Sequence, residues 1–123
     1  SMLEGATSFK GDLSRCNVSK VEDMSRMFER AISFNGDLSR WDVSNVEYMG
    51  RTFMGATSFS DDLSRWNVSN VVDMGRMFQG ATSINCQLGG TWSTSTARKY
   101  QMLYNSPCTI AGKTKDAYGT VVR

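Results

Sequence analysis

Apolar residues recur along the chain with a spacing of 25 positions. Residues 31–55 and 56–80 are identical at 17 of 25 positions, and the same register extends to both sides of them. A fixed period of this length is typical of repeat proteins, in which each unit buries its apolar face against its neighbours. The apolar columns are Ala6, Ala31, Ala56 and Ala81; Phe9, Phe34, Phe59 and Ile84; Leu13, Leu38, Leu63 and Leu88; Met24, Met49 and Met74; and Phe28, Phe53 and Phe78.

Each unit predicts a strand, a short helix and a turn. In L-S-R-W-D-V, Trp41 and Val43 alternate with polar residues at the strand period. Ser44 and Glu47 have the spacing of a capping box, and the apolar residues that follow would line one face of a helix. We therefore predict an α/β fold: a leucine-rich-repeat-like β/α solenoid of about four 25-residue coils, with a parallel sheet on one side, short helices on the other and a C-terminal cap.

The repeat also predicts the domain organisation. In the last coil the register slips by one, because Trp92 follows Trp66 by 26 residues. An open coil at the amino-terminal end would expose an apolar edge and unpaired backbone groups, so we expect a dimer through that coil. The repeat solenoid spans residues 1–106, with coils at about 6–30, 31–55, 56–80 and 81–106, and a hairpin-like cap spans 107–123.

The repeat elements carry a family resemblance. W-x-V-S-x-V at 41–46 and M-x-x-M-F at 74–78 resemble the 25–26-residue repeats of the BspA-like bacterial surface proteins, a group related to leucine-rich repeats and frequent in Mycoplasma-type lipoproteins. The resemblance covers residues 1–106, with Cys16 in place of Trp and Thr52 in place of Met. It implies a curved β/α solenoid, extracellular display and a role in adhesion or partner binding, and it implies no catalytic residues.

Composition excludes several classes of function. The formal charge of +2 is too small to predict nucleic-acid binding, and no apolar run reaches the ~18 residues of a membrane span. The chain has no His, the commonest general base and metal ligand. A calcium loop, a phosphate-binding glycine loop and a CxxC pair are missing as well. We therefore expect no enzyme activity, no cofactor and no metal.

Polar residues follow the same register and give the candidate site. Neighbouring units place their equivalent residues about 5 Å apart, so the arginines would form a column beside the strands. Two interpretations remain: a salt-bridge ladder with Asp12, Asp37 and Asp62 that keeps this face soluble, or a surface that binds an anionic or glycan ligand. The candidate ligand-binding residues are Arg15, Arg40, Arg65, Asn17, Asp42 and Asn67.

Other recurring side chains are assigned to packing or solubility. A second column, Arg26, Arg51 and Arg76, would lie on the predicted helices and indicates solubility. The tryptophans and methionines are predicted to fill the core rather than to stack on a ligand.

The three cysteines have different predicted roles. Cys16 takes the place of a core Trp and is predicted to be buried and free. Cys86 and Cys108 lie in the irregular carboxyl-terminal part and are a disulfide candidate. Such a bond would close a loop of about 20 residues, could add ~3 kcal/mol and would indicate an oxidising, extracellular setting.

The predicted function is non-enzymatic. We expect a surface-displayed or secreted repeat scaffold, located outside the cell, that binds a protein or glycan partner through its strand-side face. The alternative is a structural spacer or self-assembling repeat with no specific ligand. The outward columns hardly vary from unit to unit, which indicates either a repetitive ligand or none.

Overall fold

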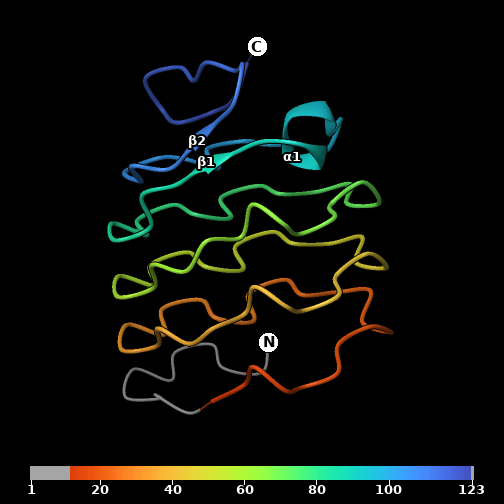
Figure 1. The fold of residues 1–123 in the computed structure, drawn as a ribbon. Helices are drawn as coiled ribbons and strands as arrows, with labels where there is room; N and C mark the ends of the chain where they lie inside the picture. The colour runs from red at the N-terminus through yellow and green to blue at the C-terminus, as the bar shows by residue number, and fades with distance from the viewer. Residues whose placement is uncertain (1–11, 123) are drawn as a thin grey trace.

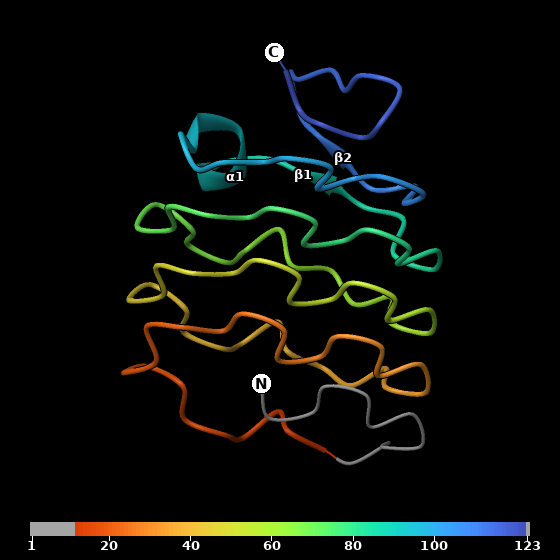
Figure 2. The same ribbon diagram turned by 180° about the vertical axis from the view of Figure 1, so that it is seen from behind.

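The computed structural model describes residues 12–122 as a stack of flat layers. The chain passes from one layer to the next in sequence order, from the amino-terminal to the carboxyl-terminal end (Figure 1), and the same stack is seen from behind in Figure 2. Equivalent residues of successive repeats lie over one another, because parallel bridges join Asp23 to Tyr48, Tyr48 to Asp73 and Asp73 to Arg98. One 25-residue repeat therefore corresponds to one layer.

Regular secondary structure is sparse and is confined to the carboxyl-terminal part of the described residues. Strand β1 is Gln87–Leu88, helix α1 is Thr91–Thr94 and strand β2 is Thr109–Ile110. The two strands form a two-stranded parallel sheet in which Gln87 pairs with Thr109 and Leu88 with Ile110. The predicted fold class is thus wrong: residues 12–122 contain neither a multi-strand parallel sheet along the repeats nor a helix in each repeat, so the predicted β/α solenoid is not formed.

The hydrogen-bond pattern explains why the repeats form no sheet. Alternate amides in each repeat donate to the next layer: Met24 to the Tyr48 carbonyl at 2.8 Å, Arg26 to Gly50 at 3.0 Å and Phe28 to Thr52 at 2.8 Å. The amides between them donate within their own layer, as when Met27 donates to the Met24 carbonyl. A parallel pair of strands needs bonds that return from the next layer as well, and here a return occurs just before the segment, as from Tyr48 to the Glu22 carbonyl at 3.2 Å, so the pairing stops at one bridge per layer. We call this one-way series of interlayer bonds the amide ladder.

Backbone angles explain why the M-x-x-M-F segments form no helix. Arg26, Arg51 and Arg76 have φ angles of 61°, 57° and 54°, in the left-handed region. Each is the third residue of a four-residue turn, the position at which a type II turn requires a positive φ. A right-handed helix cannot continue through such a residue.

The predicted capping box is replaced by a local turn. The backbone amide and the hydroxyl of Ser44 both donate to Oδ1 of Asp42, at 3.0 and 2.6 Å. Ser44 is therefore held by the residue two positions before it and caps no helix. Glu47 instead donates its amide to the Glu22 carbonyl of the preceding layer at 2.7 Å.

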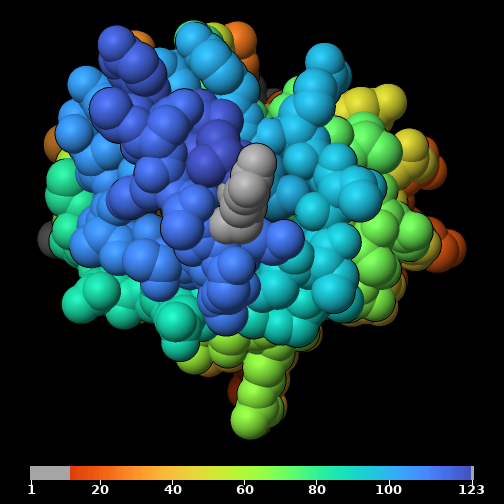
Figure 3. Space-filling view, turned by 90° about the horizontal axis from the view of Figure 1, so that it is seen from above, coloured from red at the N-terminus to blue at the C-terminus, as the bar shows by residue number. Residues whose placement is uncertain are grey.

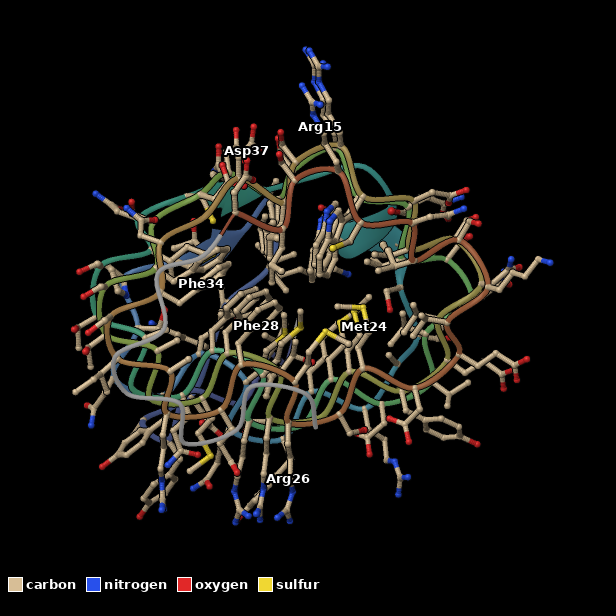
Figure 4. The ribbon with its side chains drawn as sticks, turned by 90° about the horizontal axis from the view of Figure 1, so that it is seen from below. Arg15, Met24, Arg26, Phe28, Phe34 and Asp37 are labelled. Carbon is tan, nitrogen blue, oxygen red and sulfur yellow. The ribbon has the colours of Figure 1, made fainter. Side chains whose placement is uncertain are left out.

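The core is a stack of apolar columns enclosed by the layers. Phe28, Phe53 and Phe78 are fully buried, with ring centroids 5.4 and 5.7 Å apart and nearly parallel planes. Figure 4 shows Met24, Phe28 and Phe34 pointing inward. The core assignment of the methionines and tryptophans is confirmed, since Met49 and Met74 are fully buried and Trp41 and Trp66 are 5% and 2% exposed.

The tryptophans also connect the layers. The indole Nε1 of Trp66 donates to the Leu38 carbonyl of the preceding layer at 2.9 Å, and Trp41 bonds Leu13 in the same way. The prediction that Cys16 is buried at this position is wrong, because its side chain is exposed. A thiol is too short to make the contacts of an indole, which packs against a Phe ring and reaches a neighbouring layer.

The closing segment, residues 107–122, completes the upper end of the stack. Lys115 and Val121 form an antiparallel bridge, and the segment covers part of the end layer in Figure 3. The Gly119 carbonyl accepts from the Leu103 amide at 3.0 Å, and the Thr120 hydroxyl accepts from the Gln101 amide at 2.9 Å. The closing segment therefore supplies acceptors to amides that point out of the last layer.

The one-residue slip predicted for the last coil holds only for its first part. Trp92 takes the place of Trp66, with its indole bonded to the Leu63 carbonyl. From Arg98 onward the offset is 25 again, because Arg98 pairs with Asp73, and Gln101 shares the left-handed φ of Arg76. The predicted dimer contact at the amino-terminal coil falls largely on residues 1–11, which lie outside the described residues.

Candidate functional site

The predicted arginine column lies on the surface of the stack. Arg15, Arg40 and Arg65 are exposed and occupy equivalent positions in successive layers. Figure 4, which looks along the stack, shows Arg15 pointing away from the core at one margin. The face is built from turns, such as the one closed by the Trp41 amide and the Leu38 carbonyl, and not from the strands predicted for it.

The adjacent column of Asn17, Asp42 and Asn67 is engaged in local bonds. In each layer the side-chain Oδ1 accepts from the amide and the hydroxyl of the serine two residues later, at 2.6–3.1 Å. Hydrogen bonds from the Ser44 hydroxyl and then its amide lower the pKa of Asp42 below its ordinary value. These side chains thus fix the turn beside the arginines.

The predicted salt-bridge ladder is not formed. Within the described residues, the ion pair whose nitrogen and oxygen lie within 4.0 Å of each other is formed by Arg98 and Asp73, which are 3.8 Å apart. Asp37 instead accepts from the amide and the hydroxyl of Ser39 at 3.0 and 2.7 Å. These bonds, the hydroxyl first, lower the pKa of Asp37, and the charge of Arg40 contributes less. The carboxylates therefore shape the backbone and leave the arginines without direct ion pairs.

The second arginine column lies on the opposite side of the stack. Figure 4 shows Arg26 at the margin opposite to Arg15, with guanidinium groups gathered beside it. Here the surface is hollowed into an open groove of about 400 Å³ across several layers. We call it the arginine groove; its lining includes Arg26, Arg51, Arg76, Arg98, Gly50 and Gly75.

Polar and aromatic contacts organise one end of the arginine groove. Nε of Arg76 donates to Oε1 of Gln101 at 3.2 Å, and its guanidinium carbon lies 5.3 Å from the centre of the Tyr100 ring. Asp73 accepts from the Gly75 amide at 2.8 Å and pairs with Arg98. Tyr100 remains 57% exposed.

The sequence pattern predicts helices for the second arginine column and indicates no role for it beyond solubility. The groove depends on the left-handed turns and on the layer register, which no local pattern reveals. The available signal was the pair of M-G-R triplets at 49–51 and 74–76, in which a glycine precedes each arginine.

The predicted disulfide partners lie side by side. Cys86 precedes β1 and Cys108 precedes β2, and their Sγ atoms are 2.8 Å apart as free thiols. The hydrogen bond between the two thiols raises the pKa of Cys86 and lowers that of Cys108. The disulfide itself stays a prediction.

The described residues contain neither a metal-binding cluster nor a membrane-spanning helix. Within residues 12–122, no group of three or more His, Cys, Asp or Glu side chains is placed to hold a metal ion. None of the helices there has the length and apolar character to cross a membrane.

Comparison with known proteins places the chain in a family. No curated protein and no solved structure matches it. Residues 1–116 match the model of the family described as "Mycoplasma protein of unknown function, DUF285". The match covers most of the chain, so the protein belongs to this family.

Proposed function

We propose that this chain is a non-enzymatic repeat scaffold, displayed at a cell surface or secreted, that holds a protein or glycan partner. The observation that carries the proposal is the column of Arg15, Arg40 and Arg65, which presents exposed guanidinium groups in equivalent positions of successive layers. These groups have no direct ion pair within the described residues. A carboxylate, sulfate or carbonyl-rich partner could therefore bind without displacing an internal partner.

The adjacent side chains support this role by giving the column a fixed backbone. Asn17, Asp42 and Asn67 hold identical turns in three layers, so the arginines start from equivalent positions. Such preorganisation lowers the entropy lost on binding. The narrower resemblance to BspA-like surface repeats supports a location outside the cell and an adhesion-type partner.

A spacer without a specific ligand is the second candidate. It is favoured by the near-invariance of the outward column, since recognition surfaces usually vary from repeat to repeat. In that case the arginines serve to keep the stack soluble.

Binding to an immobilised panel of sulfated glycans, neutral glycans and matrix proteins, at two salt concentrations, separates these candidates. The intact chain is compared with Arg40→Ala/Arg65→Ala, and thermal melting shows that both are folded. We expect salt-sensitive binding of a protein partner that the double variant loses. Failure of the folded chain to bind any member of the panel would favour the spacer.

A further inference from the structure

The arginine groove has a strongly one-sided charge. Four arginines contribute to its lining, against one carboxylate, that of Asp73. This carboxylate already pairs with Arg98 and accepts the Gly75 amide. Arg26, Arg51 and Arg76 have no ion pair within the described residues, so the groove offers an unneutralised row of guanidinium groups.

The backbone under this row is unfavourable for arginine. At φ angles of 54–61° an L-residue loses roughly 1 kcal/mol relative to glycine. Four positions later in the same repeats, the equivalent left-handed site is occupied by Gly55 and Gly80. Within residues 31–80 the chain therefore carries glycine at one such site and arginine at the other, although glycine suits the backbone at both; in the flanking repeats Arg30 and Asn105 occupy the second site. Strain that recurs in three layers is an outlier of the kind found at functional sites.

The lining between the arginines is open to a bulky ligand. Gly50 contributes backbone without a side chain, so a ligand can approach its peptide groups closely, whereas Oδ1 of Asp73 lies 3.1 Å from where a Cβ at Gly75 would stand. At one end the exposed ring of Tyr100, fixed against Arg76, offers a flat apolar surface of the kind on which sugar rings pack.

We propose that the arginine groove binds a linear acidic polysaccharide, whose carboxylate or sulfate groups pair with the Arg26, Arg51 and Arg76 guanidiniums. Interlayer hydrogen bonding places the backbones of these residues about 5 Å apart in successive layers, and such a row suits a polymer with anionic groups along its length. Guanidinium groups bind such oxyanions through paired, charge-assisted hydrogen bonds. This site lies on the side of the stack opposite to the Arg15 column and does not depend on it.

The test compares two double variants of the full chain with equal changes in net charge. Arg51→Gly/Arg76→Gly removes two groove guanidiniums and also relieves the left-handed backbone, so it is expected to fold. Arg40→Ala/Arg65→Ala removes two guanidiniums from the opposite side. Calorimetric titration with heparin oligosaccharides, polygalacturonate and neutral dextran, at about 50 and 300 mM salt, gives the affinities.

We expect the wild-type chain to bind the acidic polysaccharides but not dextran. The affinity for the acidic polysaccharides should be about tenfold lower in the groove variant and should change less than twofold in the opposite-side variant. Heparin binding without polygalacturonate binding would assign the site to sulfate, and the reverse to carboxylate. Equal losses in both variants would overturn the proposal in favour of diffuse charge. Absence of binding by the folded wild-type chain, or full competition by equimolar inorganic sulfate, would also overturn it.

Gly50→Ala provides a second variant that keeps every charge. A Cβ at Gly50 would have its nearest contact at 3.6 Å, with the Gly75 carbonyl oxygen, so the fold accommodates it. The added methyl group would stand among the groove-lining residues, and we expect a loss of affinity of about threefold or more. Unchanged affinity in this variant and in the groove double variant together would rule out the groove as the site.

Discussion

At the scale of single residues, the repeat depends on two left-handed positions that lie four residues apart. One is occupied by Arg26, Arg51 and Arg76, and the other by Arg30, Gly55 and Gly80. Each position is the third residue of a four-residue turn and sets the direction in which the next amide points. The positions therefore create both the amide ladder and the outward direction of the arginines.

Gly80→Ala tests the left-handed position without a steric clash. The nearest atoms to an added Cβ at Gly80 lie 3.7 Å away, but its φ is 73°. We expect the free energy of unfolding to fall by about 1 kcal/mol in urea titrations. Gly50→Ala is the matched control, because its φ lies outside the left-handed region, and it should leave stability unchanged or slightly raised. Equal losses in the two variants would contradict the backbone explanation.

Asp42 makes one layer sensitive to acid. Hydrogen bonds from Ser44 lower its pKa in the folded state. The associated stability is complete above the unfolded-state pKa, about 4, and is lost as pH falls through the lowered folded-state pKa. Asn17 and Asn67 make the same turn without titrating. Asp42→Asn should therefore leave the melting temperature at pH 7 nearly unchanged and reduce its fall between pH 7 and pH 3.

The reciprocal change, Asn67→Asp, serves as the control for acid sensitivity. It introduces a titrating carboxylate into an equivalent turn, so it should enlarge the fall in melting temperature between pH 7 and pH 3. The same fall in both variants would show that these turns do not govern acid stability.

At the scale of elements, the sequence predicts which residues are buried better than it predicts their backbone. The 25-residue period identified Met49, Phe53 and Trp66 as core, because burial depends on which side chains recur in register. The same spacing of Met and Phe also fits a helix, and only a left-handed φ at Arg51 excludes it. Arginine rarely adopts that angle, so local propensity pointed to the wrong element and concealed the arginine groove.

Substitution of Trp66 tests how strongly one layer is bound to the preceding layer. Trp66→Phe would leave a small cavity and remove the indole donor to the Leu38 carbonyl, which keeps its bond from the Trp41 amide. We expect a loss of about 2–4 kcal/mol in the free energy of unfolding, measured by urea titration. Tyr118→Phe is the control. Tyr118 is 64% exposed, so this change should have little effect on the free energy of unfolding. A loss below about 1 kcal/mol for Trp66→Phe would show that the indole bond is dispensable.

The pairing of Cys86 with Cys108 can be tested by counting thiols. With oxidised glutathione as the oxidant, one thiol of the pair displaces a first glutathione to form a mixed disulfide, and the second thiol then displaces the other glutathione to close the Cys86–Cys108 bond. Denatured, non-reduced protein should then show Cys86 and Cys108 joined without glutathione, and Cys16 either free or carrying one glutathione. Cys86→Ser removes the pair and should not gain stability on oxidation, whereas three free thiols in the oxidised wild-type chain would contradict the pairing.

At the scale of the whole molecule, the layers interact with their immediate neighbours through repeated contacts. Asn70 bonds the Ser44 carbonyl and Asn45 bonds the Ser19 carbonyl, both at 2.7 Å and both 26 residues apart. A layer can therefore be replaced by its neighbour without a change of partner types, as expected for repeat proteins.

Removal of one complete repeat tests this modularity. Deletion of residues 56–80 joins Gly55 to Ala81 and preserves the register, so the shortened chain should fold cooperatively with reduced stability. Deletion of residues 56–75 removes nearly as much chain but breaks the register, and it should abolish cooperative unfolding. Circular dichroism and thermal melting distinguish the two, and equal behaviour would contradict layer-by-layer packing.

The one-way amide ladder also gives the stack an electrical direction. Peptide dipoles in an ordinary sheet largely cancel, whereas those of a helix add along its axis. Here the interlayer amides of the M-x-x-M-F segments all point toward the carboxyl-terminal end, and their acceptor carbonyls point back. The dipoles of these segments therefore add as in a helix, with the positive end beneath the closing segment. Any molecule that extends the ladder must match this polarity, so two such stacks can join along it head to tail but not head to head.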